Sequence, residues 1–229
     1  MQSELSINTT PSGVVLSTAC FPPVGYFALV VQHEEVLIDL HETYSKQTWR
    51  NRCSLLSGNG TLHLSIPVEK PHGNHTATSK IVLSNHTNWK KNHLRSIVSA
   101  YNNAPFFLYY KDLIQQLLFD NQSNFLCEFN HNIFVKLLKE LNIPKEIKYS
   151  ESFLINPAHS NYLDLRFELS PKNKPLASYC ASTFPPYYQV FEDRFGFQPN
   201  LSILDLLFNL GPDSTDYLKQ IGRWPDFAL

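Results

Sequence analysis

A loop rich in cations and aromatic rings is the first part of the sequence whose residue types could do chemistry. Arg50 and Arg52 follow a lysine, so three positive charges fall within seven residues. Arginine can fork onto phosphate or carboxylate, and aromatic rings can stack on a base or a sugar. A solvated basic turn paired with Glu34, Glu35 or Glu42 also explains the pattern. The candidate ligand-binding residues are Tyr44, Lys46, Trp49, Arg50, Asn51 and Arg52.

A second candidate is the basic start of a helix predicted at 88–95. Lys91 and Arg95 are four residues apart, which places both on one helical face. Like charges at this spacing repel each other unless an anion bridges them, and a helix N-terminus also favours anions. The segment predicts either an anion site or a polar outer face with Trp89 half buried. Its candidate site residues are Trp89, Lys90 and His93.

An aromatic segment after residue 186 is the third candidate. Tyr187, Tyr188 and Gln189 begin it, and paired aromatic rings could line a pocket. Packing in the core is the more frequent role of such rings. We take Tyr188 and Gln189 as candidate ligand-binding residues. Asp205 lies in a nearby apolar helix, where capping of the helix explains it better than catalysis.

The sequence holds few motifs for metal or cofactor chemistry. Nine histidines occur, but without an HExxH pattern or a Cys/His cluster. It also contains no GxSxG, Walker or GxGxxG motif, so we expect no metal and no cofactor. The four cysteines are widely spaced, which favours free thiols in a cytoplasmic protein. They are Cys20, Cys53, Cys127 and Cys180.

The length and charge of the chain narrow its class. A chain of 229 residues suits one domain with a sizeable core. The 19 Lys and Arg against 20 Asp and Glu give a net charge of −1, which disfavours nucleic acid as a partner. No apolar run is long enough for a membrane helix, and no targeting segment is visible. We expect one domain over 13–220, with loose ends at 1–12 and 221–229.

Hydrophobic periodicity predicts the elements that position the candidates. A strand over 14–21, a short apolar helix or turn over 25–32 and a strand from Val36 outline a βαβ unit. Alternation over 61–69 predicts a further strand, and 80–84 predicts a short one.

The period changes to that of helices after residue 88. Two helices and a third ended by Pro144 are expected there. Residues 145–185 are the least regular, with one strand near their start. A short apolar helix follows, with Asn200 or Ser202 as its N-cap and Gly211 after its end. The predicted fold class is α/β, with a small mixed sheet from the N-terminal half and a helical C-terminal half.

Four longer segments stand in a distinctive order: YSKQTWRNRC, GNGTLHLSIPVEK, NWKKNHLRSIVSAYNNAPFF and PYYQVFEDRFGFQPNLSILDLLFNLG. Their order and spacing resemble the WbqC-like protein family over roughly residues 14–215. The chain looks most similar to the compact version of that family found in Bacteroidetes-type bacteria. The family takes its name from a member encoded with O-antigen synthesis genes. The resemblance therefore implies a role in surface polysaccharide or modified-sugar metabolism.

The resemblance also implies which residues form the site. The loop signature of the family matches Tyr44, Lys46, Trp49, Asn51 and Arg52. Its helix start matches Trp89, Lys90 and His93, and its Tyr-Tyr-Gln element matches Tyr187, Tyr188 and Gln189. Many members carry a histidine on the first strand, where this chain has Leu16.

These observations predict a cytosolic transferase-like enzyme that acts on a phosphate-bearing precursor, such as a nucleotide-linked sugar. The basic residues of 46–52 would hold phosphate, and Trp49 or Tyr44 would stack on the ligand. His93 would be the acid–base group, because histidine has an unperturbed pKa near neutrality.

Two other functions agree with the same residues. One is a non-catalytic protein that binds an anionic ligand. A less favoured one is an RNA-contacting protein, since cations and aromatic rings interleave. A single site requires the segments 44–53, 89–95 and 187–200 to meet in one pocket.

Overall fold

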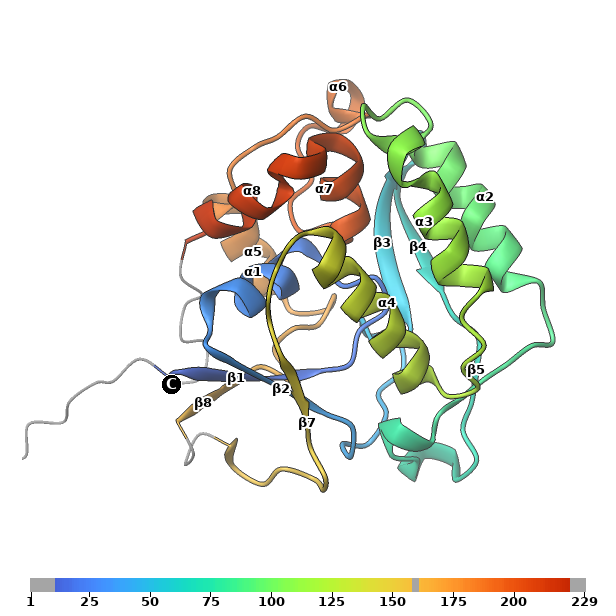
Figure 1. Ribbon diagram of the computed structural model, residues 1–229, viewed down its shortest axis with the longest axis vertical. Helices are drawn as coiled ribbons and strands as arrows, with labels where there is room; N and C mark the ends of the chain where they lie inside the picture. Colours follow the sequence, from blue (N-terminus) through green and yellow to red (C-terminus); the bar gives the residue numbers. More distant parts are fainter. Residues whose placement is uncertain (1–10, 158–160, 223–229) are drawn as a thin grey trace, which may run out of the picture.

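A parallel β-sheet of four strands lies in the lower half of Figure 1. The computed structural model describes residues 11–157 and 161–222. Most of the two ends predicted to be loose therefore lies outside the described residues. The strand order is β7-β2-β1-β8, and all three pairings are parallel. The strands are β1 (Gly13–Ser17), β2 (Glu35–Asp39), β7 (Ile147–Tyr149) and β8 (Tyr162–Asp164).

The predicted βαβ unit is confirmed at the centre of this sheet. Val14 pairs with Val36, and α1 (Val24–Gln32) crosses between β1 and β2. This helix is apolar on nearly every side because α7 (Ile203–Leu210) and α8 (Ser214–Gln220) cover it away from the sheet. In its first turn, the amide of Gly25 donates to Oδ1 of Asn200 at 2.8 Å. That bond ties the start of α1 to a distant loop.

The hairpin of β3 (Arg52–Ser57) and β4 (Gly60–Ser65) has one apolar and one polar face, because side chains alternate along a strand. Cys53 and Leu55 point into the core. On the other face Ser54 lies opposite His63, and Arg52 lies opposite Ser65. Beyond Pro67, β5 (Val68–Glu69) pairs with β6 (Val82–Leu83).

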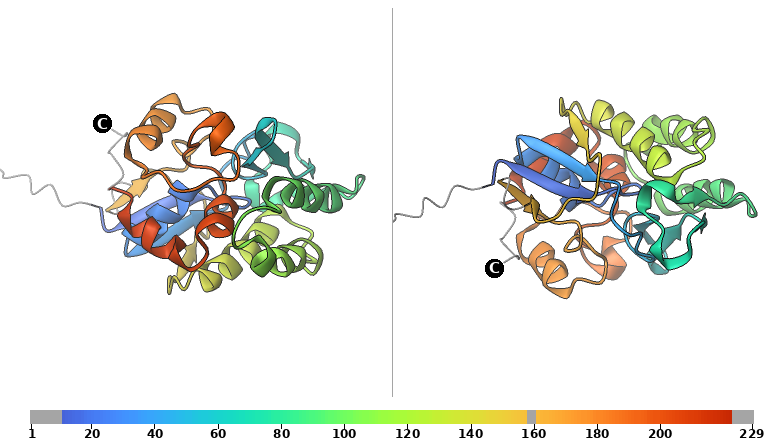
Figure 2. Two further views of the ribbon diagram at one scale, coloured as in Figure 1. Left: turned by 90° about the horizontal axis from the view of Figure 1, so that it is seen from above. Right: turned by 90° about the horizontal axis from the view of Figure 1, so that it is seen from below.

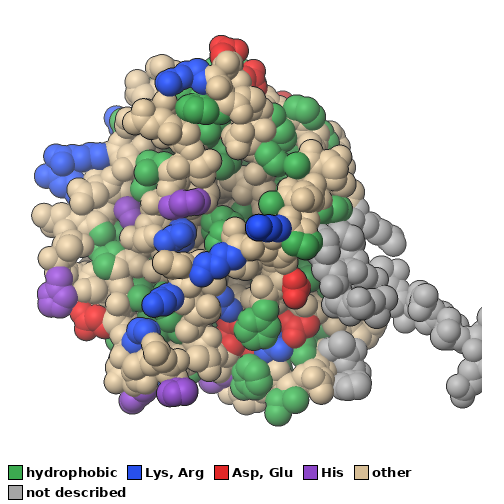
Figure 3. All heavy atoms as spheres, turned by 180° about the vertical axis from the view of Figure 1, so that it is seen from behind, with side chains coloured by type: hydrophobic (Ala, Val, Ile, Leu, Met, Phe, Trp, Pro, Cys, Tyr) green, Lys and Arg blue, Asp and Glu red, His purple; other side chains and the backbone are tan. Residues whose placement is uncertain are grey.

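The hairpin and α5 (Lys174–Thr183) lie on the same side of the molecule, and α4 (Leu126–Glu140) lies on the opposite side (Figure 2). Figure 3 shows the side of the hairpin and α5 as a surface. Lys and Arg side chains are spread across the middle of that surface.

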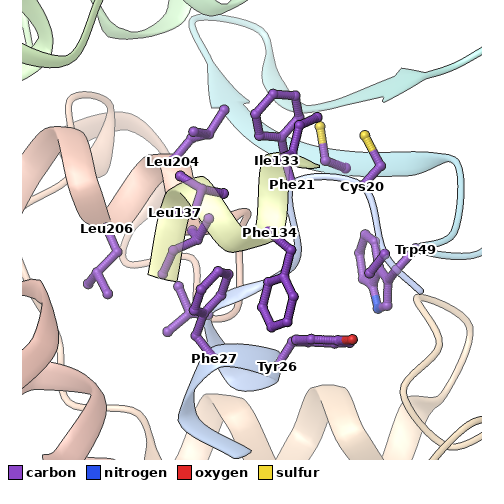
Figure 4. Close-up of a cluster of buried hydrophobic side chains, with 14 of the residues drawn as sticks. Cys20, Phe21, Tyr26, Phe27, Trp49, Ile133, Phe134, Leu137, Leu204 and Leu206 are labelled. Carbon is purple, nitrogen blue, oxygen red and sulfur yellow. The ribbon is translucent and has the colours of Figure 1, made fainter. Parts of the chain in front are cut away.

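The three predicted central helices are confirmed as α2 (Trp89–Tyr101), α3 (Phe107–Phe119) and α4. Each buries an apolar stripe, as the period of 3.6 residues requires, and α3 also exposes Leu108 and Tyr109. Phe134 of α4 packs edge-on against Tyr26 and Phe27 of α1, with ring centroids 5.5 and 5.3 Å away (Figure 4). These contacts join α4 to the helix that crosses the sheet.

The segment 145–185 is more regular than expected. It holds the predicted strand, β7, and also β8 and α5, which the sequence analysis missed. Asn173 caps α5 by accepting from the amide of Leu176 at 3.1 Å. Short helical turns complete the chain: α6 (Glu192–Phe195), η1 (Gly73–His75), η2 (Thr78–Lys80) and η4 (Gly211–Asp213).

The predicted ends of α7 are confirmed. Ser202 caps its start, with Oγ accepting from the amide of Leu204 at 3.3 Å. Gly211 ends it at a φ of 55°, and a Cβ there would lie 2.5 Å from the ring of Phe106. Glycine is therefore required by both the backbone and the packing. The capping role expected for Asp205 is wrong, because its carboxylate is bound elsewhere in the core.

The predicted α/β class is confirmed, although β7 and β8 come from the second half of the chain. Within the described ranges, every helix is too short or too polar to traverse a lipid bilayer. The fold thus supplies a parallel sheet edge and a hairpin as places to hold polar groups.

Candidate functional site

The strand order points to a site beyond the carboxyl ends of β1 and β8. Successive strands run from β1 through β2 to β7 in one direction, and β8 then pairs on the other side of β1. In open parallel sheets, ligands bind where the direction of the strand order reverses in this way. A hollow of about 10 Å³ lies at the end of β1, lined by Ser17, Thr18 and Trp49 among others. Trp49 also lines a larger cavity of about 370 Å³, between the hairpin, the start of α5 and the loop before α7. We call it the Trp49 cavity; its polar lining includes Ser54, Thr61, His63, Asn173, Gln198 and Asn200.

Trp49 forms a wall of this cavity. Its side chain is 8% exposed, and its Nε1 has no acceptor among the described residues. The carbonyl of Trp49 accepts from the amide of Cys20 at 2.8 Å, which fixes the loop to the end of β1. Figure 4 shows the indole nitrogen on the side of the ring away from Cys20. A buried donor without a partner is costly, so the surrounding packing must hold the Trp49 ring in place.

Ser54 and His63 form a hydrogen-bonded pair in the same cavity. Ser54 Oγ and His63 Nδ1 are 2.8 Å apart, because the two residues stand opposite each other in the hairpin. Partial desolvation lowers the pKa of His63, and the positive charge of Arg52 lowers that pKa further. The imidazole is therefore neutral at pH 7, and Nε2 has no partner among the described residues.

Arg52 lies on the same polar face of the hairpin, two residues before Ser54 along β3. Its Nε donates to Ser65 Oγ at 3.2 Å. It makes no ion pair within 11–157 and 161–222. The carboxylates of Asp39 and Glu42, which stand nearest in the sequence, are bound by other arginines. The forked end of Arg52 is thus free to bind an anion.

Arg50 is buried, and its guanidinium binds other side chains of the fold. Its Nε and Nη2 lie 2.7 and 2.6 Å from the two carboxylate oxygens of Glu42. Nη2 also donates to Ser17 Oγ at 2.7 Å, and Nη1 donates to Thr48 Oγ1 at 3.1 Å. Burial raises the pKa of Glu42, against the opposing effect of Arg50. The pairing with Glu42 that the sequence allowed is therefore confirmed, but it is buried rather than solvated.

A second buried cation lies at the carboxyl ends of β2 and β8. Arg166 Nη1 donates to Asp39 at 2.5 Å, and Nη2 donates to Asp164 at 2.7 Å. Ser150 Oγ donates to the other oxygen of Asp39 at 2.8 Å. The sequence analysis missed this group. The available signal was Asp39 itself, a carboxylate at the end of an otherwise apolar strand.

Other loop candidates are placed apart from the cavity lining. Tyr44 is buried, and desolvation raises its pKa to about 12. Asn51 donates to the carbonyl of Ile66 at 2.9 Å, which joins the loop to the end of β4. Lys46 is exposed.

The candidates at the start of α2 lie beside the hairpin. Trp89 and His93 are both buried, with ring centroids 5.1 Å apart. Desolvation lowers the pKa of His93 to about 4, and its Nε2 lies 3.3 Å from the carbonyl oxygen of Ser65. Arg52 and His93 therefore contact the same residue. His93 is not among the residues that line the Trp49 cavity. Lys90 donates to the carbonyl of Asn121 at 2.9 Å.

The Tyr-Tyr-Gln element separates into two environments. Tyr188 is exposed, whereas Tyr187 and Gln189 bind one carboxylate oxygen of Asp205 at 2.6 and 2.7 Å. Tyr101 binds the other oxygen at 2.9 Å. Burial raises the pKa of Asp205 to about 6, although these three hydrogen bonds lower it.

Two of the three segments expected to converge do line the Trp49 cavity. The lining includes Trp49 from the segment 44–53, and Gln198 and Asn200 from the segment 187–200. The segment 89–95 reaches the polar hairpin face through Ser65. In the described part of the chain, no group of three His, Cys, Asp or Glu side chains could hold a metal ion.

Comparison with known proteins supports the family suggested by the sequence. The family model of the WbqC-like protein family matches residues 18–172 and 154–217. The chain belongs to the WbqC-like protein family. It is also similar to a curated Mycobacterium tuberculosis protein, the uncharacterised protein Rv1507c. The two are 24% identical over an alignment of 229 positions, and this alignment covers 90% of this chain and 96% of that protein. No solved structure shows significant similarity to the chain.

Proposed function

We propose that this WbqC-like protein is a cytoplasmic transferase whose Trp49 cavity binds a phosphate-bearing donor, such as a nucleotide-linked or modified sugar, in surface polysaccharide metabolism. The observation that supports it most is Arg52, a cation without a carboxylate partner among the described residues. It is not part of the cavity lining, but it lies on the same hairpin face as Ser54 and His63, which are. Arginine binds phosphate with two parallel hydrogen bonds, which favours an anion over a neutral ligand.

The groups around the cavity suggest a division of labour. Arg52 would bind the phosphate next to the transferred group, and the ring of Trp49, which lines the cavity, would stack on the same ligand. With its proton on Nδ1 and donated to Ser54, His63 keeps an unprotonated Nε2. This neutral nitrogen suits a general base better than the buried ring of His93 does.

The proposed reaction moves a sugar from its phosphate to the hydroxyl of an acceptor. The hydroxyl oxygen of an acceptor bonds to the sugar carbon while the bond from that carbon to the phosphate oxygen breaks. The bonding electrons leave with the phosphate, whose charge Arg52 stabilises. The proton of the acceptor hydroxyl passes to Nε2 of His63.

Calorimetric titration with UDP-glucose and UMP tests the binding part. Arg52→Ala should weaken the affinity by roughly 1.5–3 kcal/mol, the range for a charge-assisted hydrogen bond. The matched control is Lys46→Ala, which removes an exposed cation from the same loop. Equal affinities for wild type and Arg52→Ala, or no binding of either probe, would contradict the proposal.

Release of UDP from UDP-glucose tests the transfer part. His63→Asn should abolish this release and keep the affinity for UMP, because the amide of Asn cannot accept the proton. Binding without UDP release from any donor and acceptor offered would instead identify a protein that only binds an anionic ligand.

A further inference from the structure

A second hollow adjoins the Trp49 cavity at the tip of the β3–β4 hairpin. It has a volume of about 510 Å³, and we call it the Arg95 groove. Thr61 lines both hollows, so the two meet at one residue of β4. A molecule in the groove would therefore lie next to one in the cavity.

The lining of the groove is rich in hydroxyl and amide groups. Ser57, Asn59 and Thr61 come from the hairpin, and Ser96 and Ser99 come from α2. Hydroxyl and amide side chains both donate and accept hydrogen bonds, which matches the alternating donors and acceptors of a polyol. No Asp or Glu side chain lines the groove.

Arg95 adds a positive charge to this lining. It is exposed, and within the described ranges it makes no ion pair and no hydrogen bond. Lys91 lies one turn earlier on α2, where its charge repels that of Arg95, but Lys91 is not part of the lining. An anion in the groove would therefore bind Arg95 rather than Lys91.

One aromatic ring completes the groove. Phe191 precedes α6, and Arg194 of that helix donates to the carbonyl of Gly58 at 2.6 Å. This bond holds the segment of Phe191 over the hairpin turn, where the ring lines the groove. An aromatic face beside hydroxyl groups offers an apolar contact for the C–H face of a sugar ring.

We infer that the Arg95 groove is the acceptor subsite and binds a sugar that carries a carboxylate or a phosphate. The inference rests on the proposed function, because it assigns the acceptor of the same transfer. The negative group would bind Arg95, and the hydroxyls would bind the serine, threonine and asparagine side chains. The reacting hydroxyl would then face the Trp49 cavity past Thr61.

Nuclear magnetic resonance titrations of the full chain with glucuronate, glucose 6-phosphate and glucose test this assignment. At least one charged sugar should shift the amide signals of Asn59, Ser96 and Ser99 and bind about tenfold tighter than glucose. The preferred probe distinguishes a carboxylate acceptor from a phosphate acceptor. Equal binding of all three sugars, or shifts confined to the Trp49 cavity, would overturn the inference.

Two matched variants sharpen the test. Arg95→Gln should weaken the preferred charged sugar about tenfold or more, whereas Lys91→Gln should change its affinity less than about twofold. Similar losses in both variants would mean that general charge, not the groove, attracts the sugar.

Arg52→Ala separates this inference from the proposed function. It should weaken UMP and leave the charged sugar bound in the groove. If UMP fails to bind anywhere while the sugar still depends on Arg95, the donor site is refuted and the groove stands. If UMP depends on Arg52 and no sugar depends on Arg95, the groove is refuted and the donor site stands.

Discussion

Arg50 and Arg52 are two residues apart, and they belong to two different polar regions of the molecule. Arg50 lies in a buried network at the sheet edge, where Glu42, Ser17 and Thr48 satisfy its nitrogens. Arg52 lies on the polar hairpin face, where Ser65 occupies one nitrogen and no described carboxylate pairs with it. The difference separates cations that hold the fold from cations that remain available to a ligand.

The largest loss of stability should follow when one partner of the buried Arg50–Glu42 pair is removed. Glu42→Ala leaves the Arg50 guanidinium buried without its counter-charge, and breaking such a pair costs roughly 3–5 kcal/mol. Urea denaturation should therefore show a fall of this size in the free energy of unfolding. The double variant Glu42→Leu with Arg50→Met should recover most of it, since both charges are removed. A loss below about 1 kcal/mol for Glu42→Ala would show that Arg50 is as free as Arg52.

Asp205 lies in another buried polar group, with Tyr101, Tyr187 and Gln189, and it should make the stability of the protein depend on pH. Its pKa is raised from 3.8 to about 6 in the folded state, so the folded protein binds this proton more tightly than the unfolded chain. The stability that the protonated carboxyl of Asp205 contributes is fully present below a pH of about 4 and is lost as the pH rises through about 6. The shift corresponds to roughly 3 kcal/mol.

Thermal unfolding from pH 4 to 7 measures this effect. The difference in melting temperature between wild type and Asp205→Asn isolates the effect of Asp205, because the amide of Asn does not titrate. A difference that stays constant between pH 4 and 7 would contradict the raised pKa.

Arg52→Lys tests the geometry of the hairpin region. The charge is kept, but a fork becomes a point charge, so lysine should restore only part of the roughly 1.5–3 kcal/mol lost in Arg52→Ala. Titration of UMP at low and high salt measures it, and the wild-type affinity should itself fall with salt. Full recovery of affinity with lysine would reduce the role of Arg52 to unspecific charge.

The smallest effect should be that of Arg52→Ala on stability. Arg52 has one hydrogen bond, to Ser65, and no ion pair to a described residue, so the free energy of unfolding should change by less than about 0.5 kcal/mol. Chemical denaturation beside Glu42→Ala provides the comparison. A loss of 2 kcal/mol or more in the free energy of unfolding would mean that Arg52, like Arg50, holds the fold together.

Local sequence patterns were sufficient where an element carries its own signal. The βαβ unit, the three central helices and the caps of α7 follow from apolar periodicity, proline and glycine. β8 and α5 carried weaker signals. β8 has three residues, and it pairs with β1, which lies far away in the chain. α5 follows a polar stretch whose cap, Asn173, is not distinctive without its neighbours.

The candidate site divides in the same way. Residue types and family resemblance directed attention to Trp49, Arg52 and the segment that holds Gln198 and Asn200, and these do surround one cavity or its edge. Sequence reasoning chose His93 as the acid–base group and passed over His63, which stands opposite Ser54 only once the hairpin register is known.

The sequence by itself determined the α/β class, the family and the presence of an excess of cations and rings in the loop of Arg50 and Arg52. Only the tertiary structure decided which arginine is free, because Glu42 meets Arg50 and Asp39 meets Arg166 through contacts that depend on how the strands align. The physical reason is that charge pairing acts over a few ångströms in space. The folded arrangement of distant segments sets those distances, and residue type alone does not.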